Sequence, residues 1–188
     1  MDEDAFRQCY GLNGSPTVLA VMMALTVLGS GWMMFALVPL YFIPATKRFA
    51  ASLLSTFVVT AIVVFVLKLI VRRPRPCHSL ERVHGLFGSP DDYSFPSGHA
   101  SGSFAFALFV TVLLVRQGQM EPTRARLCSA VSVFVLLLAC AISYSRIYLG
   151  AHFPGDVLAG AVLGGTLGTL GARRHVRRLA SDAPRDTK

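Results

Sequence analysis

The sequence predicts an all-α protein, an integral-membrane bundle of five to six transmembrane helices. Of its 188 residues, 53% are hydrophobic and only 15% are charged, whereas about 25% of the residues in an average soluble domain are charged. At least four apolar stretches approach or exceed the roughly 20 residues that a helix needs to cross a bilayer. We expect a single membrane-embedded domain over residues 1–188.

The first apolar run, Thr17–Ile43, is interrupted by Gly29-Ser30-Gly31 and contains Pro39. It is too long for one upright helix and too short for two. We expect residues 17–28 to form either a helix on the membrane surface or a tilted lead into a span from about Gly31 to Ile43. The acidic start, Met1–Asp4, does not match a cleaved secretory signal, so we expect this segment to be retained.

Four further spans follow the first run and raise the expected number of crossings to five. A polar segment, Arg72–Pro96, separates the first two of these four spans and is the only loop large enough to hold chemistry. The four spans form a core over about residues 49–172, followed by a basic tail, 173–188. The expected spans are Phe49–Val71, Ser97–Val115, Leu127–Ser145 and Phe153–Ala172.

The last expected span carries Gly160, Gly164 and Gly168 at four-residue spacing. Small residues at this spacing allow helices to approach closely in lipid. We therefore interpret these glycines as packing residues without a chemical role.

The net charge of +8 does not indicate a nucleic-acid-binding protein, because the basic residues lie at the ends of apolar runs and form no face interleaved with aromatic residues. Most of them fall on one side of the expected membrane. By the positive-inside rule this side, with the C-terminus, is cytoplasmic. We expect a bacterial inner-membrane protein whose Arg72–Pro96 loop lies on the periplasmic side. The basic residues on the cytoplasmic side are Lys47, Arg48, Arg116, Arg124, Arg126, Arg173, Arg174, Arg177, Arg178, Arg185 and Lys188.

The cysteines and acidic residues suggest neither a metal nor a cofactor. The four cysteines contain no Cys-x-x-Cys pair, and no cluster of Asp and Glu suited to Mg²⁺ is visible. Cys9 and Cys77 both fall on the outer side, where a disulfide is chemically allowed. Free thiols are the favoured interpretation.

Three polar clusters lie at ends of the expected spans. Lys68 and Arg75-Pro76 follow the second span, where they are either lipid anchors or ligands for an anion. Pro96-Ser97-Gly98-His99 begins the third span, where Ser97 suits an N-cap and free N–H groups can bind an anion. The third cluster, across the turn between the last two spans, contains Ser145, Arg146, His152 and Asp156.

Alternating helix directions place the three clusters at the same membrane face. Together they offer three cations (Lys68, Arg75 and Arg146) and two histidines, with Asp156 one helical turn from His152. A carboxylate on one imidazole nitrogen leaves the other nitrogen free to attack. The combination predicts a site for a dianionic phosphoryl group.

These residues resemble the three-part signature of the type 2 phosphatidic acid phosphatase superfamily, which also includes the vanadium haloperoxidases. The segments Lys68–Pro76, Pro96–His99 and Ser145–Asp156 match the signature in order. The resemblance implies that His152 is the nucleophile, that Asp156 orients it and that His99 protonates the leaving oxygen. It also implies that the phosphoryl oxygens are bound by Lys68, Arg75, Ser97, Gly98 and Arg146. Family members of this size usually have six spans, one more than the sequence indicates.

We therefore expect a metal-independent lipid phosphatase that acts through a phosphohistidine. Among lipid substrates, undecaprenyl pyrophosphate is favoured over phosphatidate, phosphatidylglycerol phosphate and a lipid A phosphate. Arg72 and Arg73, which could contact a second phosphate, carry this preference; the alternative is a basic helix end that meets lipid headgroups. The membrane spans argue against a haloperoxidase. A lipid carrier without chemistry is the alternative of another class.

Overall fold

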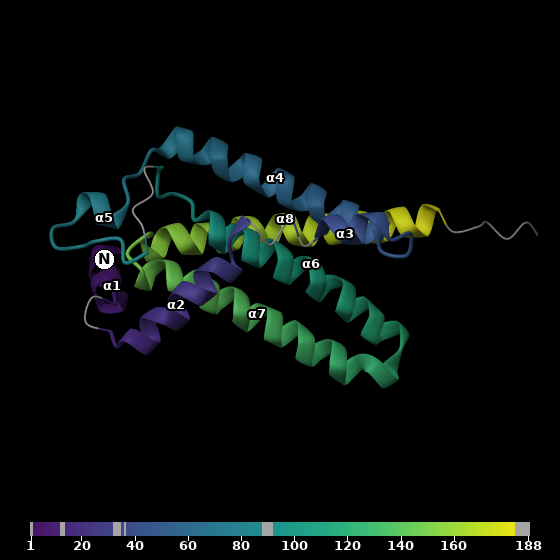
Figure 1. Ribbon diagram of the computed structural model, residues 1–188. Helices are drawn as coiled ribbons and strands as arrows, with labels where there is room; N and C mark the ends of the chain where they lie inside the picture. Colours follow the sequence, from purple (N-terminus) through teal and green to yellow (C-terminus); the bar gives the residue numbers. More distant parts are fainter. Residues whose placement is uncertain (1, 12–13, 32–34, 36, 88–91, 183–188) are drawn as a thin grey trace, which may run out of the picture.

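Four long helices run side by side along the molecule (Figure 1). The computed structural model describes residues 2–11, 14–31, 35, 37–87 and 92–182. Within these residues, four helices are long and apolar enough to cross a membrane. This agrees with the last four spans expected from the sequence. They are α4 (Lys47–Val71), α6 (Gly98–Met120), α7 (Ala125–Tyr148) and α8 (Pro154–Ser181).

The N-terminal third differs from the expected single span over Gly31–Ile43. Two short helices, α2 (Pro16–Leu28) and α3 (Leu37–Phe42), have 13 and 6 residues, or lengths of about 20 and 9 Å. The expectation of one continuous span is therefore wrong for the described part of this segment; residues 32–34 and 36 lie outside it. Gly29 caps the end of α2, and Pro39 fits only the first turn of a new helix.

Helix α2 belongs to the bundle and not to a separate surface layer. It begins behind the N-cap Ser15 and packs against α7, where Thr26 Oγ1 lies 2.8 Å from Ser145 Oγ. Helix α3 packs at the opposite end of the molecule, where Leu37 contacts a core of Leu53, Phe109 and Ala172.

Glycines hold α6 and α8 at backbone contact. A Cβ atom added to Gly164 would lie 1.9 Å from the Ser101 carbonyl oxygen, and one added to Gly168 would lie 2.2 Å from that of Ala105. Only glycine permits this approach, so the expected packing role is confirmed for these positions. This contact between α6 and α8 also fixes the start of α6 against the start of α8.

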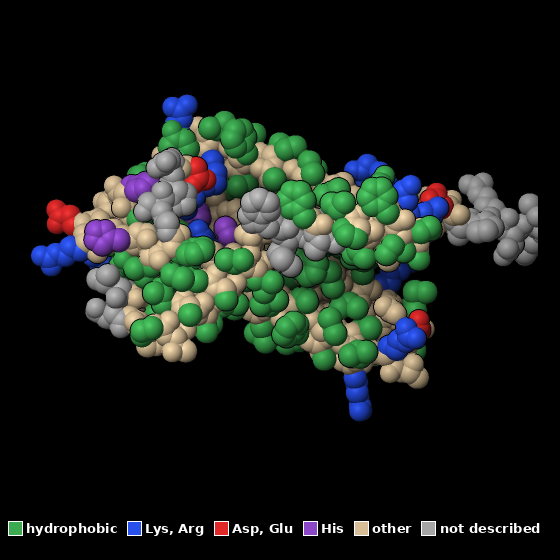
Figure 2. Space-filling view, in the orientation of Figure 1, with side chains coloured by type: hydrophobic (Ala, Val, Ile, Leu, Met, Phe, Trp, Pro, Cys, Tyr) green, Lys and Arg blue, Asp and Glu red, His purple; other side chains and the backbone are tan. Residues whose placement is uncertain are grey.

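Charged side chains gather at the two ends of the molecule, and hydrophobic side chains cover the middle of the face in Figure 2. The expected basic tail begins inside a helix, because α8 continues through Ser181. Its last turns carry Arg173, Arg174, Arg177 and Arg178, at the end of the bundle where α4 begins. Arg185 and Lys188 lie outside the described residues.

Helix α1 (Asp2–Cys9) covers the opposite end, next to α5 (Pro76–Ser79). Its Phe6 is fully buried against Val83, Ile147 and Phe153. This contact attaches the N-terminal helix to the junction of α7 and α8. Cys9 and Cys77 are both free thiols, as favoured from the sequence.

Candidate active site

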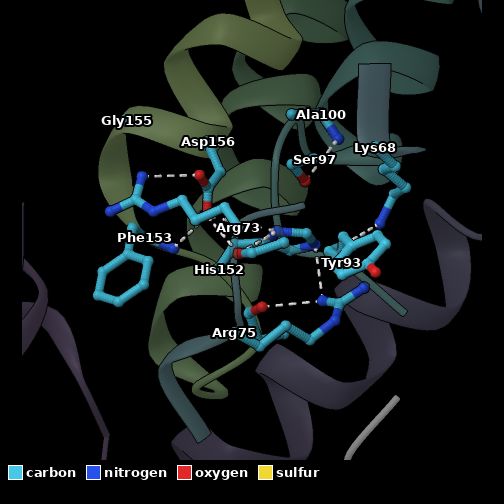
Figure 3. Close-up of polar contacts among 12 residues, drawn as sticks. Lys68, Arg73, Arg75, Tyr93, Ser97, Ala100, His152, Phe153, Gly155 and Asp156 are labelled. Atoms are coloured by element: carbon cyan, nitrogen blue, oxygen red, sulfur yellow. Dashed lines mark hydrogen bonds and ion pairs between the residues drawn. The ribbon is translucent and has the colours of Figure 1, made fainter. Parts of the chain in front are cut away.

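The three predicted polar clusters meet at the end of the bundle that α1 covers (Figure 3). Lys68 reaches this end from the last turn of α4, and Ser97 lies at the start of α6. His152 and Asp156 come from the junction of α7 and α8. The backbone N–H of Ser97 donates to the Asp156 carbonyl oxygen at 3.0 Å, which ties two of the clusters together directly.

Arg75 is the central cation of the site. Helix α4 ends at Val71, its C-cap Arg72 turns the chain with a φ of 51°, and α5 begins after the extended Arg75. The Arg75 side chain is only 4% exposed. Its Nη1 donates to the Ala151 carbonyl oxygen at 2.8 Å and lies 3.1 Å from Nε2 of His152.

His152 is almost fully buried, at 2% exposure, between Arg75 and the carboxylate of Asp156. A guanidinium group only donates hydrogen bonds, so Nε2 is the acceptor and the neutral ring carries its proton on Nδ1. Nδ1 lies 3.4 Å from Ser94 Oγ and 3.8 Å from Asp156 Oδ2. Burial, together with the nearby Arg75 and Arg146, lowers the pKa of His152 to about 4.

Asp156 is fully buried and is held by several donors. Its Oδ2 accepts from the Phe153 N–H at 2.9 Å and from the Ser94 hydroxyl. The sequence places Asp156 within reach of His152, but 3.8 Å exceeds a direct hydrogen bond. The hydroxyl of Ser94 contacts both groups, and sequence reasoning missed this residue although it lies three positions before Ser97.

Arg73 forms an ion pair with the other oxygen of Asp156. From the sequence, Arg73 was considered only as a contact for a second phosphate or for lipid headgroups. Its Nη1 is 2.9 Å from Asp156 Oδ1, and its Nη2 is 2.7 Å from Asp2 Oδ2. The guanidinium carbon lies 4.1 Å from the centre of the Phe153 ring. These contacts hold Arg73 against Asp156 and Asp2, and the interpretation that it meets a second phosphate stays a prediction.

Asp2 joins the N-terminal helix to this network. Besides Arg73, it accepts a hydrogen bond from the Gly155 N–H at 2.9 Å. No pattern in the sequence pointed to Asp2, because it lies 154 positions before Asp156. Arg72 takes no part, since its Nε donates to the Leu69 carbonyl oxygen at 2.9 Å.

The start of α6 has the geometry expected for Ser97 and its neighbours. Ser97 is the N-cap, and its Oγ accepts from the Ala100 N–H at 3.4 Å. Gly98 and His99 occupy the first two positions of the helix and line a cavity. The positive end of the α6 dipole therefore faces the site.

Lys68 and Arg75 share a carboxylate that sequence reasoning did not select. Lys68 Nζ lies 2.6 Å from Asp92 Oδ2, and Arg75 Nε lies 3.1 Å from Asp92 Oδ1. Partial burial raises the pKa of Asp92, but Lys68 and Arg75 outweigh it and hold that pKa below its ordinary value. Asp92 is therefore ionised at neutral pH.

Arg146 is the third predicted cation and is 6% exposed. Its Nη1 donates to Thr26 Oγ1 at 3.1 Å, which links α7 to α2. Its buried Nε has no hydrogen-bond partner among the described residues. An unsatisfied buried guanidinium nitrogen is costly, and an anion in the site would satisfy it.

A cavity of about 700 Å³ opens beside Lys68, bounded by α2, α3, α4, α6 and α7. Its polar end contains Lys68, Asp92 and His99. The rest of its wall is mostly apolar, with Phe57, Val64, Phe106, Leu138 and Ile142 among the lining residues. Within the described residues, no three His, Cys, Asp or Glu side chains are grouped so as to hold a metal ion.

A bundle of membrane-spanning helices defines an integral-membrane protein, and in this one a cationic, histidine-containing cluster lies beside an apolar cavity. Known proteins identify its family. The profile of the PAP2 superfamily matches residues 49–179, so the chain belongs to this superfamily.

Several curated relatives carry names of lipid phosphatases. A decaprenylphosphoryl-5-phosphoribose phosphatase of Mycobacterium tuberculosis is 32% identical over 172 residues, 87% of this chain and 86% of that protein. A lipid A 4'-phosphatase of Bacteroides thetaiotaomicron is 39% identical over 95 residues, 49% of this chain and 37% of that protein. An undecaprenyl-diphosphatase of Sulfolobus acidocaldarius is 32% identical over 125 residues, 66% of this chain and 54% of that protein.

A solved structure has the same architecture. LpxE of Aquifex aeolicus superposes with a TM-score of 0.72 at 29% identity, over 90% of this chain and 93% of that one.

Proposed function

We propose that this protein is a lipid phosphatase that removes a terminal phosphate through a covalent phosphohistidine on His152. The observation that carries the proposal is the orientation of the buried imidazole. Its Nε2 points at Arg75 in the cation cluster, while Nδ1 points at Ser94 and Asp156. In the neutral ring Nε2 carries the lone pair, which accepts from Arg75 in this structure and can attack phosphorus once a phosphoryl group takes over that hydrogen bond.

The phosphoryl oxygens are bound by groups at the same end of the bundle. Lys68, Arg75 and Arg146 supply positive charge, and the unpaired Nε of Arg146 gains an acceptor. Ser97 and Gly98 present the N-terminus of α6. Fixed cations and helix donors stabilise the charge of a phosphoryl transition state, so the step needs no metal ion.

The reaction proceeds in two steps that balance in atoms and charge. The lone pair of His152 Nε2 attacks phosphorus, the bond from phosphorus to the lipid oxygen breaks, and His99 gives that oxygen a proton. Water then attacks the phosphohistidine, His99 takes a proton from it, and the bond from phosphorus to nitrogen breaks. Asp156 stabilises the Nδ1 proton and the positive charge that develops on the ring.

The apolar cavity supports a lipid substrate, because a hydrocarbon tail fills it while the phosphate meets Lys68 and His99 at its polar end. Among lipids we favour polyprenyl-linked phosphates. The relative matched over nearly its whole length is named for a decaprenyl-linked phosphomonoester, which supports a monoester. Undecaprenyl pyrophosphate is the second candidate; a contact of Arg73 with its second phosphate would compete with the ion pairs that Arg73 makes with Asp156 and Asp2.

We further propose that the site faces away from the cytosol, in a bacterial inner membrane. The support is the distribution of basic residues, which gather at the end of the bundle opposite His152. A cysteine placed at the exposed Glu81, in a chain without its native cysteines, should react with an impermeant maleimide in intact cells. Reaction only after permeabilisation would reverse the assignment.

The activity test is phosphate release from a panel of lipids by the purified protein with a chelator present. The panel holds a polyprenyl monophosphate, a polyprenyl-linked sugar phosphate, undecaprenyl pyrophosphate, phosphatidate, phosphatidylglycerol phosphate and a lipid A phosphate. We expect release by the wild type and by His84→Ala, whose side chain is exposed outside the site, but not by His152→Ala. Binding of a lipid without release would instead indicate a carrier.

A further inference from the structure

The Asp92 carboxylate lies where a phosphoryl group is expected to bind. Its two oxygens contact different cations: Oδ2 lies 2.6 Å from Lys68 Nζ, and Oδ1 accepts from Arg75 Nε at 3.1 Å. A phosphoryl group would bind in the same way, with one oxygen on the ammonium group and another on the guanidinium group. Asp92, Lys68 and His99 line the same end of the cavity, so a phosphate entering from it meets this carboxylate.

The two cations also make hydrogen bonds that do not involve the Asp92 carboxylate. Arg75 donates to the Ala151 carbonyl oxygen, and Lys68 donates to the Tyr93 carbonyl oxygen. Their side chains are 4% and 12% exposed, whereas that of Asp92 is 53% exposed. The buried cations are thus fixed parts of the site, and the carboxylate is the part that can turn toward water.

We infer that Asp92 is a built-in anion that occupies the phosphoryl site of the empty enzyme and must be displaced by the substrate phosphate. Any anion that enters must break the contacts of Asp92 with Lys68 and Arg75 before it gains its own. A bilayer surface presents many phosphodiester headgroups, and this competition weakens their binding to the open cations. The inference rests on the proposed function, because it assumes that Lys68 and Arg75 receive the phosphate.

The test is the affinity of the full-length protein for inorganic phosphate, measured by equilibrium dialysis in detergent at pH 8. Asp92→Asn keeps the shape of the side chain and removes the competing charge. We expect it to bind phosphate about ten- to a hundredfold more tightly than the wild type, the ratio that corresponds to one lost charge-assisted hydrogen bond. Asp92→Ser, which shortens the side chain, should change the affinity in the same direction.

The matched control is Glu81→Gln, which makes the same change of charge at an exposed position of the same loop. It should leave the affinity unchanged. Equal or weaker binding by both Asp92 variants, with their folding verified by thermal unfolding, would overturn the inference and make Asp92 a positioning residue for the two cations.

Arg75→Ala separates this inference from the proposed function. If the proposed site is correct, Arg75→Ala must lose phosphate binding both in the wild-type background and in the Asp92→Asn background. If Arg75→Ala bound phosphate as the wild type does, the assignment of the phosphoryl site itself would be wrong.

Discussion

The two sides of helix α6 differ sharply. Toward α8 its backbone makes direct contact, because α8 has glycine at positions 160, 164 and 168, where a side chain would clash with α6. Toward the cavity it presents Gly102, where an added Cβ would meet nothing within 4 Å. The close-packed side positions Ser97 against Asp156, and the open side leaves space for a lipid tail. Helix α6 thus has a close-packed side that positions the catalytic residues and an open side that lines the cavity.

The largest expected effect comes from disturbing the close-packed side. Gly164→Ala places a Cβ 1.9 Å from the Ser101 carbonyl oxygen, so the two helices must move apart. We expect a loss of about 3 kcal/mol or more in the free energy of unfolding, with loss of activity. Thermal unfolding in detergent measures it. Gly165→Ala, whose Cβ finds its nearest atom at an ordinary 3.7 Å, is the control, and equal stability of the two variants would refute the close contact.

The two histidines of the site also divide between these sides. His152 is buried on the close-packed side, whereas His99 lines the cavity. With the pKa of His152 lowered from 6.5 to about 4, its ring is neutral and nucleophilic at neutral pH. The unfolded chain binds more protons between these values, so the contribution of His152 to stability falls as the pH drops through this window.

Histidine-labelled protein in detergent allows a direct check by NMR. The resonances absent from His152→Gln identify the residue, and their titration in the wild type should have a midpoint near 4. A midpoint near 6.5 would contradict the burial described for this side chain.

A smaller effect is expected on the open side. Gly102→Leu extends a side chain into the cavity from a Cβ that meets no atom within 4 Å, and leucine favours the helix. We expect KM for a long-chain lipid phosphate to rise about tenfold, the cost of displacing a few buried methylene groups, with turnover of a water-soluble aryl phosphate unchanged. Gly102→Ala should lie between the wild type and Gly102→Leu. A parallel loss with both substrates would place the lipid tail elsewhere.

The smallest expected effect concerns the contact of α1 with the close-packed side. Asp2→Asn removes the ion pair between Asp2 and Arg73, and Arg73 also forms an ion pair with Asp156. Because the Asp2–Arg73 pair is about one-third exposed, we expect only a two- to fivefold lower kcat, with KM unchanged. Glu3→Gln, an exposed neighbour, is the control. A wild-type kcat in Asp2→Asn would show that α1 does not support the site.

Much of the fold followed from the sequence. The apolar runs predicted the starts of α4, α6, α7 and α8 to within two residues, because twenty apolar residues have few other stable arrangements in lipid. The ends were less well predicted, since α8 continues to Ser181 and not to Ala172. The N-terminal third was predicted incorrectly, because a span was expected over Gly31–Ile43 and the described residues form the short helices α2 and α3. The glycines at 29 and 31 and Pro39 signalled a break, but whether α2 would pack on α7 depended on tertiary contacts such as Thr26 with Ser145.

The site divides in the same way. The three clusters were predicted to converge because helix direction alternates, and the structure brings Arg75, His152 and Asp156 together. Ser94, Asp92 and Asp2 were missed, since a hydroxyl or carboxylate in a loop has no periodicity that reveals its partner. The contacts of Arg73 with Asp156 and Asp2 could not be read from the sequence either, because they span 83 and 71 residues.

The central claim is that His152 forms a bond to phosphorus, and trapping this intermediate tests it most directly. An aryl phosphate has a leaving group that needs no proton, so His99→Ala should still form the phosphohistidine and should fail to hydrolyse it. Incubation with ³²P-labelled aryl phosphate, an alkaline quench and mass spectrometry should locate the label on His152. Phosphate release by His152→Ala at the wild-type rate, or label on another residue, would contradict the account.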